Sequence, residues 1–172
     1  LFPAYASTVL PPVNSGNGVF IFYKTSEEVT FVKTVEGEWV KLADYIQSAK
    51  DELDALKAEK ETLNCFASDL VLIETTVADA KVALDEAEDA AEVLEIFNNA
   101  KAIIEAIQAK DVVIAEANAE LDAYKAGLFR EAEEAQRAEA VATAKEAIAV
   151  ANSSEDVANI VASAIEAIDA LK

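Results

Sequence analysis

The sequence lacks the side chains on which most enzyme and metal chemistry depends. Its 172 residues include no histidine and no methionine, and only one cysteine, four glycines and three prolines. Without histidine the chain has neither the usual general base near neutral pH nor the commonest transition-metal ligand. The single cysteine, Cys65, cannot form a disulfide within the chain or a thiolate metal cage. Ser-His-Asp and Cys-His catalysis are therefore excluded.

Motifs that bind phosphate, calcium or a covalent intermediate are absent as well. The sequence contains no glycine-rich phosphate loop, no nucleophile elbow and no EF-hand loop. Adjacent carboxylates are frequent, as in Glu133-Glu134 and Glu155-Asp156. On exposed helices such pairs are typically solvated charges rather than acid–base pairs. We predict that the protein is not an enzyme and that it has no catalytic residue, no cofactor and no metal ligand.

Positive charge is scarce. The chain has 14 basic and 33 acidic residues, a formal net charge of -19. A surface this negative repels phosphate backbones and anionic lipid, so we expect no nucleic-acid partner and no simple membrane-surface binding. The charge indicates either solubility in a salty or extracellular setting or a surface for cations or a basic partner. No apolar run approaches the roughly 18 residues that a membrane-spanning helix needs.

The first residues hint at export. The absence of methionine indicates a processed chain or a fragment. Ala4-Tyr5-Ala6, followed by Ser7, resembles the small-residue end of a secretory signal, although an ordinary extended arm explains it equally. We expect an extracellular or cell-surface location, with a virion as the alternative.

Residues 1–18 predict an extended N-terminal arm. They contain all three prolines and an Asn/Gly cluster, which favour extended backbone followed by a turn or joint. An extended segment with apolar side chains usually lies on another surface, here the chain's own helices or a neighbouring copy. The apolar residues of the arm are Leu1, Phe2, Tyr5, Val9 and Leu10.

Residues 19–41 predict a small antiparallel β meander. Segments 19–24, 29–35 and 38–40 are rich in β-branched and aromatic residues, and Glu36-Gly37 is a tight-turn signal. So small a sheet is not stable alone. Its aromatic face must be covered by helix, by another subunit or by a host particle, although an aromatic cluster can also bind sugar. That face comprises Phe20, Phe22, Phe31 and Trp39.

From residue 42 the apolar residues recur at helical spacing. The longest seam runs from Val93 to Leu128, interrupted only by Lys110, and predicts one long helix of roughly 50 Å if unbroken. Ser68 is expected to cap the helix that begins near residue 66, and Ser153 or Ser154 is expected to cap the last helix. Lys60 and Lys110 on the seams are expected to snorkel or to set the helix register.

The helical part contains an internal repeat. The heptapeptide 52–58 recurs at 120–126, and residues 77–108 align without gaps on 141–172. The repeat predicts two units of three helices each. Four extra residues in the first copy are expected to add about one helical turn or a longer loop. The expected helices are 41–63, 66–87 and 89–108 in the first unit, then 111–126, 128–151 and 154–171 in the second.

These patterns predict a mainly α fold, in which a small N-terminal antiparallel β meander precedes tandem antiparallel three-helix bundles. The expected segments are an arm (1–18), the meander (19–41), a first bundle (42–109) and a second bundle (110–172). Because 109–111 carries no helix breaker, three arrangements stay open. One helix could run through both bundles as a stiff rod, the helices could fold into one compact bundle, or the seams could form an intermolecular coiled coil.

The second unit, from Tyr124-Lys-Ala-Gly-Leu-Phe-Arg through Ala-Lys-Glu-Ala-Ile-Ala-Val-Ala-Asn to Ile165-Glu-Ala-Ile-Asp-Ala-Leu-Lys172, resembles three-helix repeat modules of large Gram-positive bacterial surface proteins, of the FIVAR and albumin-binding type. The resemblance covers about residues 115 to 172 and is a pattern of alanines and caps. It implies a spacer or adhesion role outside the cell and carries over no binding residue.

The sequence therefore favours a non-enzymatic extracellular structural or interaction protein, a helical spacer or assembly subunit anchored through its arm and β element. One alternative is a phage fibre or decoration protein, and another is a module that binds glycan or a host protein. Expected partners are proteins, through self-association or a larger assembly. The candidate contact residues are Leu1, Phe2, Tyr5, Val9, Leu10, Phe20, Phe22, Phe31 and Trp39.

Overall fold

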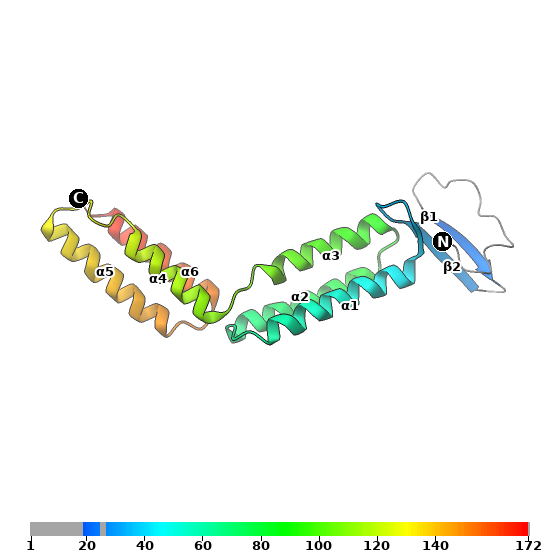
Figure 1. Ribbon diagram of the computed structural model, residues 1–172, viewed down its shortest axis with the longest axis horizontal. Coiled ribbons are helices and arrows are strands. Elements are labelled where there is room, and N and C mark those ends of the chain that lie inside the picture. Colours follow the sequence, from blue (N-terminus) through cyan, green and yellow to red (C-terminus); the bar gives the residue numbers. More distant parts are fainter. Residues whose placement is uncertain (1–18, 25–26, 172) are drawn as a thin grey trace. The chain divides into compact units, whose positions relative to one another are not determined.

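The computed structural model describes the backbone of residues 19–24 and 27–171, and the side chains of residues 28–171. Within these ranges three strands precede six helices (Figure 1), which confirms the predicted mainly α fold with its N-terminal meander. The elements are β1 (Val19–Lys24), β2 (Glu27–Lys33), β3 (Trp39–Lys41), α1 (Leu42–Glu61), α2 (Ala67–Asp85), α3 (Ala90–Glu105), α4 (Lys110–Ala123), α5 (Glu131–Ala149) and α6 (Ser154–Asp169).

The three described strands form one antiparallel sheet in the order β1-β2-β3. The β2–β3 connection is a tight turn, in which the amide of Gly37 donates to the carbonyl of Thr34 at 2.9 Å. Gly37 has a φ of 88°, which glycine adopts without the steric penalty of a side chain. The predicted Glu36-Gly37 turn is therefore present, and β3 leads directly into α1.

The chain divides into two compact units. The first contains the described residues up to Glu59 together with Ile73–Ala106, and the second contains Lys60–Leu72 together with the described residues from Ile107 on. The α1–α2 turn therefore belongs to the second unit, although most of α1 and α2 belongs to the first.

The core of the first unit is built from one apolar stripe on each helix. Leu53 of α1, Ile73 and Leu84 of α2, and Val93 and Ile104 of α3 are at most 1% exposed. Burying a large aliphatic side chain contributes about 1.5–3 kcal/mol. Side-chain ion pairs between α1 and α2 fasten the edge of this core; they join Lys50 to Asp85 and Lys81 to Asp54.

The second unit buries the corresponding stripes of α4, α5 and α6, which lie side by side in Figure 1. Leu121, Ile148 and Ile168 are fully buried. Phe66, from the α1–α2 turn, joins this core and is 3% exposed. Most other buried positions are alanine or valine, which let the helices approach closely but contribute little burial each.

A single helix running through both bundles, one of the arrangements that the sequence leaves open, does not form. α3 ends at Glu105 and α4 begins at Lys110. The amide of Lys110 donates to the carbonyl of Asn64 at 2.7 Å, and the ammonium of Lys60 donates to the carbonyl of Ile107. The break is thus held by hydrogen bonds from the α1–α2 turn, which is distant in sequence, and this explains why no glycine or proline marks it.

Side chains cap two helix starts, at Asp89 and at the predicted Ser153, and the predicted cap at Ser68 is absent. Asp89 caps α3 by accepting from the amide of Glu92, and Ser153 caps α6 by accepting from the amide of Asp156. Ser68 does not cap α2, because α2 begins one residue earlier and the Ser68 hydroxyl donates to the carbonyl of Asn152.

Candidate functional site

The predicted contact residues fall into three groups. Leu1, Phe2, Tyr5, Val9 and Leu10 lie outside the described residues. Positions 20 and 22 lie in β1, and the strand register places them on the same face of the sheet as positions 31 and 39. Phe31 is 1% exposed, whereas Trp39 is half-buried. Of the two aromatic residues whose side chains are described, only Trp39 exposes surface that a partner can contact. The binding of sugar or protein by the sheet stays a prediction.

The described residues offer no concentration of catalytic chemistry. Among them, no group of three or more His, Cys, Asp or Glu side chains could hold a metal ion together. Cys65 is buried and its thiol contacts the carbonyl of Lys60. Burial raises the pKa of the Cys65 thiol, so at neutral pH it stays protonated and weakly nucleophilic. In the described part of the chain no helix is long and apolar enough to span a bilayer.

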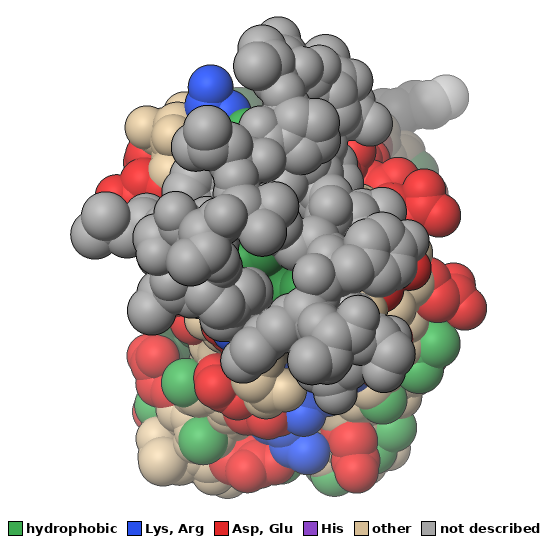
Figure 2. All heavy atoms as spheres, turned by 90° about the vertical axis from the view of Figure 1, so that its right-hand side faces the viewer, with side chains coloured by type: hydrophobic (Ala, Val, Ile, Leu, Met, Phe, Trp, Pro, Cys, Tyr) green, Lys and Arg blue, Asp and Glu red, His purple; other side chains and the backbone are tan. Residues whose placement is uncertain are grey.

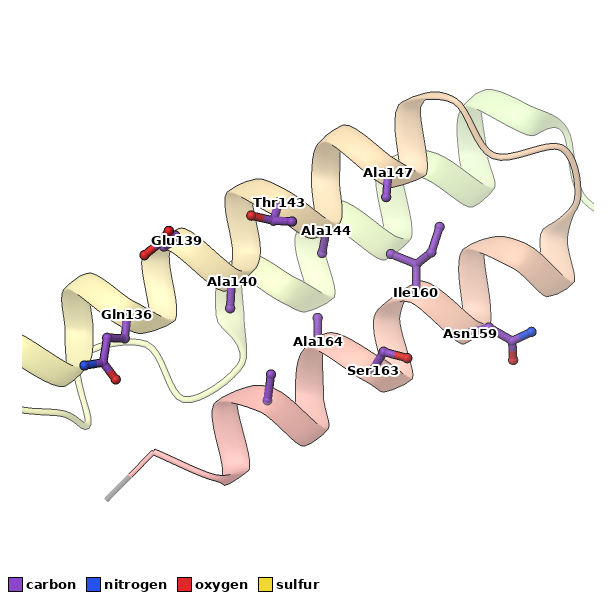
Figure 3. Close-up of a pocket in the computed structure, with 11 residues that line it drawn as sticks. Gln136, Glu139, Ala140, Thr143, Ala144, Ala147, Asn159, Ile160, Ser163 and Ala164 are labelled. Carbon is purple, nitrogen blue, oxygen red and sulfur yellow. The ribbon is translucent and has the colours of Figure 1, made fainter.

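An open groove of about 580 Å³ lies between α5 and α6 in the second unit. Ala140, Ala144 and Ala164 lie along it, and Ile160 points into the space between the two helices (Figure 3). The groove exists because small side chains on both helices leave room. Of its lining residues only Glu139 is charged. The sequence signal is alanine, serine and threonine at helical spacing on both helices, a pattern that by itself indicates only core.

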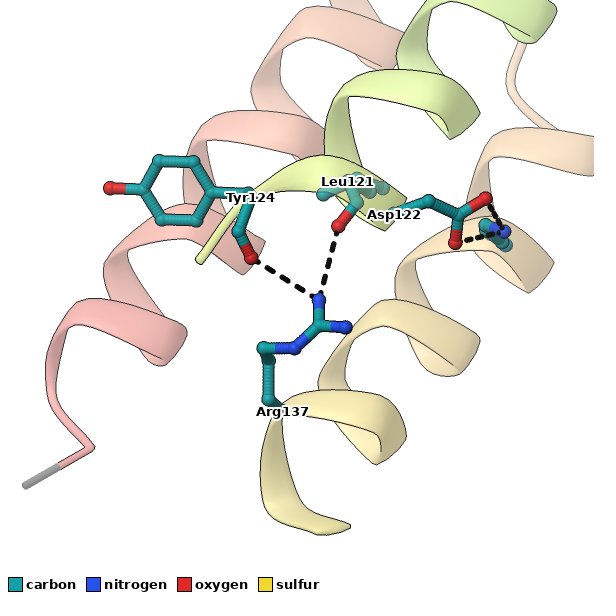
Figure 4. A network of polar contacts seen from close by, with 5 residues as sticks. Leu121, Asp122, Tyr124 and Arg137 are labelled. Atoms are coloured by element: carbon teal, nitrogen blue, oxygen red, sulfur yellow. Dashed lines mark hydrogen bonds and ion pairs between the residues drawn. The ribbon is translucent and has the colours of Figure 1, made fainter. Parts of the chain in front are cut away.

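A buried arginine on α5 binds the C-terminal end of α4. Arg137 of α5 is 9% exposed, and its Nη1 donates to the carbonyls of Leu121 at 3.4 Å and Tyr124 at 3.2 Å (Figure 4). Its Nε donates to the carboxylate of Glu134 at 2.8 Å. The carbonyls at a helix C-terminus have no partner within the helix. Arg137 therefore supplies the donors that end α4, a role that no motif in the sequence indicates.

A cluster of exposed side chains fastens the α4–α5 turn to the end of α6. The carboxylate of Asp169 accepts from the Tyr124 hydroxyl at 2.8 Å and pairs with the Lys125 ammonium at 2.7 Å. These hydrogen bonds, from Lys125 first and then Tyr124, lower the pKa of Asp169. The hydrogen bond to Asp169 in turn raises the pKa of Tyr124 and that of Lys125.

Acidic side chains outnumber basic ones on the described part of the face in Figure 2. Asp and Glu are spread over the described part of the face shown in Figure 2, with few Lys and Arg between them. Such a surface disfavours anionic partners at short range.

No protein-family profile, curated protein or solved structure matches the chain.

Proposed function

We propose that the protein is a non-enzymatic structural or interaction protein that works outside the cell. Its tandem three-helix bundles serve as a spacer or display surface, and its N-terminal arm and sheet contact a partner or another copy. The observation that carries the proposal is that one three-helix design occurs twice in the chain.

The duplication extends to individual interactions. α2 and α5 each have 19 residues, and α3 and α6 each have 16. Lys81 binds both carboxylate oxygens of Asp54 at 2.6 and 2.7 Å, and Lys145 binds those of Asp122 at 2.5 and 2.6 Å. The two lysines occupy the same position in the repeat alignment. A design repeated at this level supports a role that depends on the scaffold.

The sheet supports a contact role for the N-terminal part. The described sheet has only three short strands. Among the described strands β1 and β3 lie at the two edges of the sheet, and within the described residues each pairs with β2 on one side only. The arm precedes β1 directly and carries no charged residue, unlike the rest of this acidic chain. An uncharged apolar arm avoids the repulsion that copies of the helical part exert on one another.

The test compares the full chain with a variant that lacks residues 1–18. We expect light scattering and sedimentation to show assemblies for the full chain and monomers for the variant. A matched control replaces the arm with a Gly-Ser segment of equal length, which removes the apolar side chains only. Monomers for all three chains at every concentration would contradict assembly through the arm.

A further inference from the structure

The groove between α5 and α6 lies where the second copy lacks two aliphatic side chains that the first copy has. Gln136 of α5 and Ala167 of α6 both line the groove. In the repeat alignment they correspond to Leu72 of α2 and Ile103 of α3. The same three-helix design therefore carries apolar side chains at this place in one copy and leaves a hollow in the other.

The groove also has a different charge from the matching face of the first copy. Thr143 and Asn159 line it at the positions where the first copy has Asp79 and Glu95. Glu139, which aligns with a threonine, is the one charged residue among the lining side chains. In a chain with a formal net charge of -19, a nearly uncharged groove accepts an uncharged segment without the repulsion that acidic surfaces exert on each other.

The dimensions and the walls of the groove suit a short extended segment. Its lining runs along α5 from Gln136 to Ala147, which is roughly 16 Å at 1.5 Å per residue. An extended chain advances about 3.3 Å per residue, so about five residues span that length. Both walls are helices, whose backbone groups are paired within the helix and cannot form a ladder with the occupant. A segment that contains proline suits such walls, because proline has no amide hydrogen that needs a partner.

The arm, residues 1–18, combines these properties. It carries no charged residue, contains all three prolines of the chain, and has five large apolar side chains. It belongs to an uncharged stretch, 1–23, that continues into β1. The next longest uncharged run in the sequence is 157–165, which lies within α6. Most other segments of this chain would bring carboxylates into the groove, so charge selects the arm as the occupant.

We propose that the arm of one copy of this chain lies in the α5–α6 groove of another copy. Its apolar side chains pack against Ala140, Ala144 and Ile160 (Figure 3) and supply the aliphatic groups that Leu72 and Ile103 supply in the first unit. The inference rests on the proposed function and deepens it, because it names the surface that the arm contacts. Since arm and groove are different surfaces, the contact is head-to-tail.

Two pairs of substitutions close the groove with residues that the first copy carries at the same positions. Gln136→Leu with Ala167→Ile fills it, and Thr143→Asp with Asn159→Glu gives it negative charge. The other copy of the design accommodates all four residues, so we expect both variants to fold, which circular dichroism checks. The control is Ala142→Ile, which adds an apolar group on an exposed position of α5 outside the groove.

Sedimentation at several concentrations measures self-association of the full chains. We expect each groove variant to associate about tenfold more weakly than the natural chain or worse, because the arm loses its apolar contact, and the control to associate like the natural chain. Groove variants that assemble like the natural chain, when the chain with the Gly-Ser arm is monomeric, would overturn the inference and leave the proposed function standing. A natural chain that is monomeric at every concentration would overturn both.

Mixing two full-length variants tests whether the arm and the groove belong to different copies. One chain has the Gly-Ser arm and a natural groove, and the other has a natural arm and the groove filled by Gln136→Leu and Ala167→Ile. We expect each to be monomeric alone and the mixture to form one-to-one pairs of twice the mass, because each pair has one functional contact. A mixture that stays monomeric would overturn the inference, and it is the result expected if the arm lies on its own chain or on a different protein.

Discussion

The two three-helix regions agree in their cores and differ at their ends. Leu53 and Leu121 are both fully buried at corresponding positions, and so are Ile104 and Ile168. Yet α1 has 20 residues and α4 has 14, while the turn that follows is slightly shorter after α1. The extra residues of the first copy therefore lengthen its first helix. Close packing in the core of a bundle leaves little room for substitutions, whereas the ends of a bundle can form different contacts.

The clearest single difference is Ile73 against Arg137, which correspond when the repeat alignment is extended back through α2 and α5. Ile73 is 1% exposed and fills the first core, whereas Arg137 reaches the carbonyls that end α4. The shorter α4 leaves these carbonyls inside the second bundle, where a charged donor is more useful than an aliphatic side chain.

The grooves between the second and third helices differ for a related reason. Leu72 of α2 and Ile103 of α3 correspond to Gln136 of α5 and Ala167 of α6, and Leu72 and Ile103 are 48% and 44% exposed. The smaller residues leave the hollow of about 580 Å³, whereas a hollow of about 290 Å³ between α2 and α3 is lined by three glutamates. Among the described hollows, the large one with almost no charge therefore belongs to the second unit.

The largest expected effect tests whether the two cores are equivalent. Leu121→Ala should lower the free energy of unfolding by about 2–5 kcal/mol through lost burial and a residual cavity. Leu53→Ala, its matched control in the other copy, should cost a similar amount because both side chains are fully buried. Urea denaturation followed by circular dichroism measures both. A negligible effect at one position with a large effect at the other would break the equivalence.

The second-largest expected effect tests the difference between Ile73 in the first copy and Arg137 in the second. Arg137→Ala should lower the free energy of unfolding by about 1–3 kcal/mol, because the Leu121 and Tyr124 carbonyls lose a charged donor in a buried place. Arg137→Ile supplies the residue of the first copy and keeps apolar volume, but not the hydrogen bonds. If Arg137→Ile were as stable as the natural chain in the same denaturation experiment, the hydrogen-bonding role would be refuted.

Removing either helix cap, Asp89 or Ser153, is expected to cause a smaller loss of stability, equal at the two positions. Asp89→Ala and Ser153→Ala should each cost about 1 kcal/mol, since each removes the acceptor for an amide in the first turn of its helix. Ser68→Ala is a suitable comparison because Ser68 lies inside α2 and does not cap it. Thermal unfolding of the three variants gives the stability that each one loses. A larger loss for Ser68→Ala than for either cap variant would contradict the assigned caps.

The smallest effect concerns pH. The pKa of Asp169 is lowered in the folded chain, so its contribution to stability is present above the ordinary pKa of an aspartate, about 3.9, and is lost as the pH falls through the lower folded value. The stability difference between the natural chain and Asp169→Asn should therefore be small, constant near neutral pH, and should shrink in acid. A difference that grows as the pH falls would contradict the assigned partners.

Much of the fold could be predicted because the helical signals are local. The predicted helices match the observed ones to within a few residues, and the spacing of apolar residues and the cap at Ser153 account for that. The break after α3 could not be predicted, because its causes, Lys60 and Asn64, are distant in sequence. Ser68 misleads for the same reason, since its partner is Asn152.

The candidate surfaces are less accessible to sequence reasoning. The arm and the aromatic strands are indicated by their apolar character, which is a local property. The α5–α6 groove depends instead on which residues of the two helices lie opposite each other. The apolar spacing places Leu128 on a helix seam, but it lies in the turn and is largely exposed.

Residue-resolved amide hydrogen exchange of the intact chain tests the tandem design most directly. We predict that the protection profile along residues 67–105 repeats along 131–169 in the register of the sequence repeat, with the lowest protection at 86–89 and 150–153 and a further interruption at 106–109. Unbroken strong protection from α3 into α4, or two profiles that cannot be superposed in that register, would contradict the account.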